Sequence, residues 1–194
     1  MEYAPDDVES MYRTLSGAVV PRPIAWVSST NPDGVDNLAP YSFFNVVSVE
    51  PPTVMFSPLD TDERSKDTTR NVRETEEFVV NVVTGDTVEA MNETSATLQA
   101  DQSEFEHAGV TRVDSETVEP PRVAESPVNF ECSLYDTLRV GDSVLVIGEV
   151  EHVHVDDALA PDGELDVREL DAVGRLAGSF YSYTRDRFSL ERPP

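Results

Sequence analysis

Lysine is almost absent from this chain of 194 residues. Lys66 is the only lysine among 14 basic residues, which face 38 Asp and Glu residues and leave a formal net charge of −24. General nucleic-acid binding needs a basic stripe, and this balance excludes it. An acidic surface with little lysine is typical of proteins kept soluble in concentrated salt, so the composition predicts a halophile. Disorder is the alternative interpretation of high charge, but the Val, Ile and Phe runs favour a folded chain.

Cysteine, histidine and long apolar runs are also scarce. The single Cys132 excludes an internal disulfide, and we predict that it is a buried structural thiol. His152 and His154 share one face of an expected strand, but no further ligand is marked, so no metal site is predicted. No apolar run approaches the roughly 20 residues of a membrane span, and no signal-peptide pattern opens the sequence. These absences predict a cytoplasmic protein that makes no membrane contact.

The segment 21–58 organises the rest of the chain. We expect three strands in this region, over 18–29, 35–49 and 53–56, with a tight turn at 31–34. Hydroxyl and amide side chains occur at intervals along these otherwise apolar strands. They are Ser28, Ser29, Thr30, Asn37, Ser42 and Asn45. Such a mixture suits a flat amphipathic ligand, with its ring on the apolar part and its polar rim on the side-chain donors. A plain sheet with a serine-rich loop is the alternative.

The segment 64–73 has a net positive charge, unlike the chain as a whole. It holds four basic residues and one acid, a local charge of +3 on a protein at −24. Ser65 can cap a helix on which Lys66, Arg70 and Arg73 share one face. A helix N-terminus with hydroxyls and a lysine can bind an anion. The alternative is a solvated helix that pairs with acids elsewhere, and we favour that interpretation for Arg73.

The remaining patterns predict a mainly β fold with short α-helices in one domain, 1–194. A strand buried on both faces is expected at 77–83, and a hairpin is expected from two further strands joined through Gly141. The other expected elements are a short helical lead-in within 1–16, helices over 86–92, 100–107 and 166–170, a loop with one short strand over 111–126, strands over 128–138 and 143–155, and a segment of small and aromatic residues over 173–183.

Several motifs, in order, resemble those of the flavin reductase-like family. They are Pro-Arg-Pro-Ile-Ala at 21–25, Asn-Leu-Ala-Pro-Tyr-Ser-Phe-Phe-Asn at 37–45, Pro-Pro-Thr-Val-Met-Phe-Ser at 51–57, Ser-Lys-Asp-Thr-Thr-Arg-Asn at 65–71, Glu-Phe-Val-Val-Asn at 77–81, and shorter pieces at 104–105, 131–132, 147–150 and 175–183. The resemblance covers nearly the whole chain. It implies an FMN-binding split β-barrel.

The resemblance also implies cofactor-binding residues. The phosphate group is expected to lie against Ser28, Ser29, Thr30, Lys66 and Arg22, with Ser65 and Thr68 in the same motif as Lys66 and Trp26 beside that end of the cofactor. The ribityl chain and isoalloxazine ring are expected along Asn37, Pro40, Tyr41, Ser42 and Asn45, with Phe180 and Tyr181 near the ring. For Trp26, a place in the core is the alternative. No catalytic side chain is predicted, since the cofactor carries the chemistry.

The implied activity is that of an FMN-dependent oxidoreductase, an NAD(P)H-dependent flavin reductase, with small-molecule donor and acceptor. No GxGxxG motif is present, so NADH or NADPH would dock on the flavin rather than in a Rossmann fold. Ser143 stands where many NAD(P)H-using relatives carry a histidine after the late Gly-Asp, which leaves the donor open. A flavoredoxin-like carrier, a ferric reductase and a non-catalytic flavin-binding module are the alternatives. The resemblance also implies a homodimer.

Overall fold

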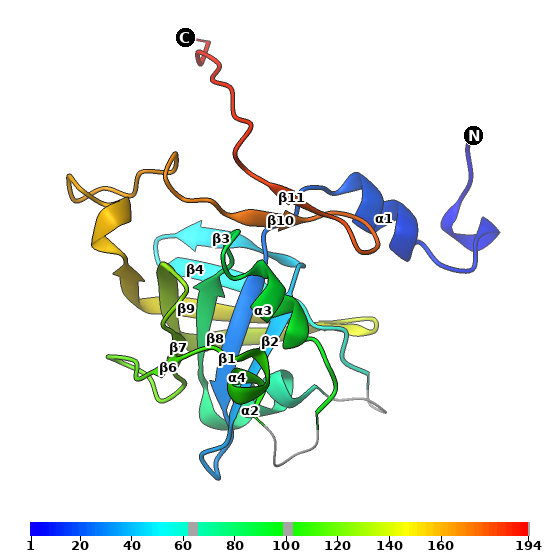
Figure 1. Cartoon of the computed structure of the whole chain (residues 1–194). Helices are drawn as coiled ribbons and strands as arrows, with labels where there is room; N and C mark the ends of the chain where they lie inside the picture. The colour runs from blue at the N-terminus through cyan, green and yellow to red at the C-terminus, as the bar shows by residue number, and fades with distance from the viewer. Residues whose placement is uncertain (62–65, 99–102, 194) are drawn as a thin grey trace.

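A computed structural model describes residues 1–61, 66–98 and 103–193. Its main feature is an antiparallel sheet of seven strands in the order β2-β1-β5-β8-β9-β4-β3 (Figure 1). These strands are β1 (Ala25–Thr30), β2 (Asp36–Tyr41), β3 (Phe44–Val49), β4 (Pro52–Phe56), β5 (Glu77–Val82), β8 (Val128–Val140) and β9 (Ser143–Val155). Two small sheets pair β6 (Arg112–Val113) with β7 (Arg122–Val123), and β10 (Val173–Arg175) with β11 (Tyr181–Tyr183).

The helices are short. They are α1 (Tyr12–Ala18), α2 (Asp67–Thr75), α3 (Val88–Glu93) and α4 (Glu104–Ala108), with 3₁₀ turns at Pro5–Asp7 and Asp157–Leu159. α2 packs against β1 and β2, while α4 packs against α3 and β2. The prediction of a mainly β fold with short helices is confirmed. Among the described residues, no helix is both long and apolar enough to cross a bilayer.

The sheet curves around an apolar core, and its two edges belong to consecutive strands. β2 and β3 stand at opposite ends of the strand order, yet only Ser42 and Phe43 separate them along the chain. The Phe43 carbonyl accepts a hydrogen bond from the Ser57 N–H at 2.8 Å, which holds this bend against the end of β4. The prediction of one continuous strand over 35–49 is therefore wrong, because the chain turns a corner at 42–43 to reach the other edge.

Two apolar clusters lie on opposite sides of the sheet. The barrel core contains alternate residues of β1 and β5, together with Phe56 of β4 and Val72 of α2. The second cluster lies between the other side of the sheet and the helices α3 and α4, and contains Trp26, Leu38 and Met91. Strand β5 contributes Phe78 and Val80 to the barrel core, and residues 78–81 are all fully buried, which confirms the expected burial on both faces. Side-chain alternation along a strand thus decides which of the two environments a residue enters.

Several other expected elements are confirmed and several are wrong. The turns at 31–34 and 139–142 form, with Gly34 at φ 82° and Gly141 at φ 59°. The first strand begins at Ala25 rather than at residue 18, because Ala18 ends α1 and because Pro21 and Pro23 have no N–H for a ladder. The segment 111–126 holds two short strands rather than one, 166–170 forms turns without a helix, and 173–183 forms the β10–β11 hairpin. Residues 100–102 of the expected helix 100–107 lie outside the described residues.

Candidate functional site

One group of predicted site residues meets where α2 crosses β1 and β2. The Thr68 hydroxyl oxygen accepts hydrogen bonds from Asn37 Nδ2 at 2.7 Å and from Tyr41 Oη at 2.9 Å. Thr68 is buried, while Asn37 and Tyr41 are partly exposed. A hydroxyl oxygen that accepts two hydrogen bonds still carries its own proton, so Thr68 can donate to a ligand oxygen.

The register of β1 and β2 explains this grouping. Ser29 lies opposite Asn37 and Ala25 lies opposite Tyr41, so these four side chains share one face of the strand pair. Asn71 of α2 reaches the same face, and its Nδ2 donates to Ser29 Oγ at 3.2 Å. Ser29, Asn37, Tyr41 and Thr68 therefore form one polar group, which we call the α2 cluster.

The neighbouring residues of β1 face the other way. Ser28 Oγ donates to the Pro121 carbonyl at 2.5 Å, and Thr30 Oγ1 donates to Asp36 Oδ1 at 2.6 Å. Trp26 is 0% exposed, and its indole N–H donates to Thr94 Oγ1 at 2.9 Å. The three hydroxyls expected around one phosphate are thus divided by strand alternation, with Ser29 on the α2 side and Ser28 and Thr30 on the opposite side.

The start of α2 carries a cation two residues before Thr68. Lys66 is the N-cap residue and is exposed, and the helix proper begins at Asp67. Asp67 pairs with Arg70 at 2.6 Å, so that arginine is partly neutralised within its own helix. Ser65, the expected cap, lies outside the described residues. In the described part of the chain, Thr69 Oγ1 and Asn71 Oδ1 are buried without a hydrogen-bond partner.

Burial shifts the acid–base behaviour near the α2 cluster. Desolvation raises the pKa of Tyr41 to about 12, so its phenol stays protonated and remains a donor at neutral pH. Burial also raises the pKa of Glu104, whose Oε2 accepts the Leu38 N–H at 3.3 Å on the edge strand β2. Sequence reasoning noted Glu104 only as part of a motif. Its position on the sheet edge depends on how α4 packs against β2.

The remaining predicted residues lie apart from the α2 cluster. Arg22 is buried and donates to carbonyl oxygens of Ser16, Val19 and Leu176, two of them at the end of α1. Tyr181 Oη donates to Asn92 Oδ1 at 3.2 Å, and Phe180 is 71% exposed on the β10–β11 connection. The other three predicted residues are Pro40 in β2, Ser42 in the bend and Asn45 in β3. Pro40 and Ser42 are partly exposed, and Asn45 is exposed.

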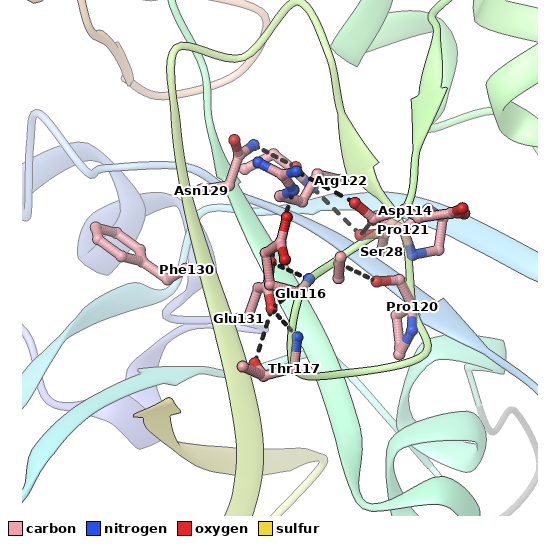
Figure 2. A network of polar contacts seen from close by, with 12 residues as sticks. Ser28, Asp114, Glu116, Thr117, Pro120, Pro121, Arg122, Asn129, Phe130 and Glu131 are labelled. Atoms are coloured by element: carbon pink, nitrogen blue, oxygen red, sulfur yellow. Dashed lines mark hydrogen bonds and ion pairs between the residues drawn. The ribbon is translucent and has the colours of Figure 1, made fainter. Parts of the chain in front are cut away.

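A second polar network, which the sequence did not reveal, lies behind Ser28 (Figure 2). Glu131 of β8 is 0% exposed, and its carboxylate accepts hydrogen bonds from the Glu116 N–H, the Thr117 N–H and the Thr117 hydroxyl at 2.7 to 3.1 Å. Arg122 Nε lies 3.6 Å from Glu131 Oε1, an ion pair without a hydrogen bond. Glu131 thus fixes the 114–121 loop, whose Pro121 carbonyl holds Ser28.

Metal binding gains no support from these groups. In residues 1–61, 66–98 and 103–193, no three His, Cys, Asp or Glu side chains are grouped to hold an ion. Burial raises the pKa of the Cys132 thiol well above its usual range, so this cysteine stays protonated. The polar side chains of the α2 cluster remain the best candidate for ligand binding.

Known proteins resemble this chain over most of its length. The family described as "Flavin reductase like domain" matches residues 16–170. The protein BH2278 of Halalkalibacterium halodurans is 43% identical, covering 100% of this chain and 97% of its own length. Nitrilotriacetate monooxygenase component B from Bacillus cereus has a TM-score of 0.92 at 35% identity, covering 98% of each chain. The 2-nitrobenzoate 2-nitroreductase NbaA from Pseudomonas fluorescens has a TM-score of 0.90 at 33% identity, covering 100% of this chain and 96% of that one.

Proposed function

The protein belongs to the flavin reductase-like family, and we propose that it binds FMN at the α2 cluster and acts as an NAD(P)H-dependent flavin reductase. The observation that carries this proposal is the convergence of Asn37 and Tyr41 on Thr68, next to Lys66 at the start of α2. The neighbours at 35% and 33% identity are named as a monooxygenase component and a nitroreductase, which supports a role in oxidation and reduction. The family membership implies a flavin, and the choice of FMN is our proposal.

The residues present fit FMN. A phosphate group needs a cation and hydroxyl donors, and Lys66 with the Thr68 hydroxyl offers both at a helix N-terminus. The unpartnered Thr69 Oγ1 and Asn71 Oδ1 give this end of the sheet spare hydrogen-bonding capacity, which suits a polyhydroxylated chain. When bound, FMN would supply the electron-transfer chemistry. The chain's own residues would bind and orient it, and the protonated Tyr41 would keep the Thr68 oxygen in place.

We also propose that the protein works in concentrated salt, as a single domain in the cytoplasm, and pairs as a homodimer. At about 1 M salt the Debye length is near 3 Å, so diffuse attraction is screened and a phosphate must be held by direct contacts. The α2 cluster provides such contacts. The acidic composition of the chain supports the salt assignment.

Lys66→Ala should weaken FMN binding about 10- to 100-fold, because one charge-assisted hydrogen bond contributes roughly 1.5–3 kcal/mol. The matched control is Arg73→Ala, which removes the same charge from an exposed position on the same helix. That control should change the dissociation constant less than about threefold. Fluorescence titration of free FMN into the apoprotein measures both values in molar potassium chloride. Equal effects of the two variants would mean that only net charge matters, and the phosphate role of Lys66 would be wrong.

Reductase activity is tested by anaerobic titration of the FMN-loaded protein with NADH and with NADPH. Loss of the oxidised flavin absorbance with either nucleotide supports a nicotinamide-dependent reductase despite Ser143. A flavin that stays oxidised with both, yet is reduced by dithionite, would exclude this activity and favour an electron carrier.

The similarity to NbaA favours a second candidate function, nitroaromatic reduction. Consumption of 2-nitrobenzoate by the reduced protein would distinguish the two.

A further inference from the structure

Glu104 lies at the open edge of strand β2, beside the α2 cluster. Both α2 and α4 pack against β2, the strand at one end of the strand order (Figure 1). Glu104 is the first residue of α4, and its Oε2 accepts a hydrogen bond from the Leu38 N–H at 3.3 Å. Leu38 follows Asn37 in β2, so the carboxylate contacts the strand next to a member of the α2 cluster.

The Leu38 N–H needs this acceptor. In an antiparallel pair, the backbone groups of alternate residues point away from the partner strand. Leu38 points its N–H away from β1, and Pro40, the next residue on that side, has no N–H. Leu38 is fully buried, so without Glu104 its N–H would have neither water nor a strand to bind. The carboxylate therefore holds β2 between the two residues that donate to Thr68.

Three carboxylates lie near this side of the α2 cluster. Burial is the main cause of the raised pKa of Tyr41. Three neighbouring charges raise that pKa further, those of Asp67, Asp60 and Glu104. Lys66 is the cation proposed for the phosphate, and Asp67 follows it directly. An anion bound at the α2 cluster would therefore meet repulsion from these carboxylates as well as attraction to the lysine.

The charge of Glu104 depends on pH. Burial is the largest cause of its raised pKa, and the charge of Asp67 adds to it, whereas backbone hydrogen bonds and the nearby His107 lower it. As the pH falls, Glu104 therefore loses its charge at a higher pH than an exposed glutamate does. On α3 and β2, which pack against α4, the titratable groups are Glu89, Glu93, Asp36 and Tyr41. Glu93 lies 3.8 Å from His107, and Asp36 is paired with Arg112 at 2.7 Å.

We propose that Glu104 determines how strongly the α2 cluster prefers a phosphorylated flavin to an unphosphorylated one. Its negative charge opposes the phosphate of FMN but not the neutral riboflavin, while its hydrogen bond to Leu38 supports the binding of both. When the carboxylate takes up a proton, the repulsion ends and the preference for FMN increases. Glu104 is thus a positioning and specificity-determining residue. The inference rests on the proposed FMN site and identifies a group that regulates it.

Glu104→Gln separates the charge from the hydrogen bond, because the amide oxygen can still accept the Leu38 N–H. Above neutral pH this variant should bind FMN about 3- to 10-fold more tightly than the wild type, since one partly screened like charge is removed. Its affinity for riboflavin should stay within about twofold of the wild type. Glu104→Ala also removes the hydrogen bond and should weaken riboflavin binding about fivefold or more, because a buried N–H is left unsatisfied.

Glu106→Gln is the matched control, since it removes the same charge from an exposed position of α4. It should change neither dissociation constant more than about twofold, as expected of an exposed charge. Fluorescence titration of FMN and of riboflavin into the flavin-free full chain, in molar potassium chloride, measures all these constants. An equal change for FMN and riboflavin in Glu104→Gln would overturn the inference and leave the flavin site standing. If neither flavin binds to the wild type or to Glu104→Gln, the proposed FMN site is itself refuted, and the inference with it.

The pH profile tests the charge directly. The phosphate of FMN takes up a proton with a pKa of about 6 in every variant, so the ratio of the wild-type and Glu104→Gln dissociation constants isolates Glu104. That ratio should fall toward one as the pH is lowered, and a ratio of one at every pH would overturn the inference. In the flavin-free protein, the Leu38 amide signal in NMR spectra should move with a midpoint above about 4.3, the ordinary glutamate pKa. Glu104→Gln should lack that movement, and an unmoved wild-type signal would overturn the inference even where FMN binds.

Discussion

Glu131→Ala should lower the free energy of unfolding by about 3–5 kcal/mol, the range seen when one partner of a buried charged pair is removed. The carboxylate is fully buried and accepts hydrogen bonds from two N–H groups and one hydroxyl of the 114–121 loop. Alanine leaves those donors unsatisfied and leaves Arg122 without its ion-pair partner. Urea denaturation followed by circular dichroism measures the change.

Two controls separate the charge from the hydrogen bonds. Glu131→Gln keeps the shape of the side chain but turns one acceptor into a donor that faces N–H groups, so it should recover only part of the loss. Thr117→Val removes one hydroxyl donor and should cost about 1 kcal/mol. If Glu131→Ala and Thr117→Val lower stability equally, the network does not act through the buried carboxylate.

The pH dependence of stability provides a further check on Glu131. Burial alone would raise the pKa of this group, but the hydrogen bonds from Glu116 and Thr117 outweigh it and lower the pKa below the usual glutamate value. The stabilisation is therefore fully present above the usual glutamate pKa, and it declines as the pH falls through the lower native value. The Glu131→Gln variant should lack that part of the acid sensitivity of the wild type.

Sequence patterns predicted the strands and turns with strong local chemistry. β5 and the β8–β9 hairpin follow from β-branched runs and from Gly141, which adopts positive φ in the turn. The corner at Ser42 and Phe43 was missed, because aromatic and polar residues continue through it without a proline or glycine to mark a break. Only the pairing of β2 with β1 and of β3 with β4 shows that the two segments belong to opposite edges.

The candidate site was predictable in residue type but not in side-chain direction. Ser28, Ser29 and Thr30 all carry hydroxyl groups, and which of them faces α2 depends on how that helix packs on β1. Glu131 was hidden for a different reason. In a chain with 38 acidic residues, no local pattern of the sequence shows that the carboxylate of Glu131 is buried.

Trp26→Ala should also lower the free energy of unfolding by about 3–5 kcal/mol, the usual cost of removing a large aromatic side chain from a core. Trp26 is fully buried among Leu38, Met91 and their neighbours, on the α3–α4 side of the sheet. The smaller change Trp26→Phe keeps a ring but loses the hydrogen bond to Thr94, and should cost about 1–3 kcal/mol. Circular dichroism is the suitable probe, because the substitution removes the chain's only tryptophan.

Trp26→Phe decides between the two interpretations of Trp26 that the sequence leaves open, a place beside the cofactor and a place in the core. Its neighbours in β1 and β2 that form the α2 cluster face the opposite side of the strand pair, so a core tryptophan should not touch a cofactor bound there. Trp26→Phe, measured where it is still folded, should therefore bind FMN within about threefold of the wild type. A tenfold weaker affinity with unchanged stability would place the cofactor on the α3–α4 side, where Ser28 and Thr30 lie. In that case Ser28 and Thr30 would lie at the ligand, and Ser29 would have a structural role only.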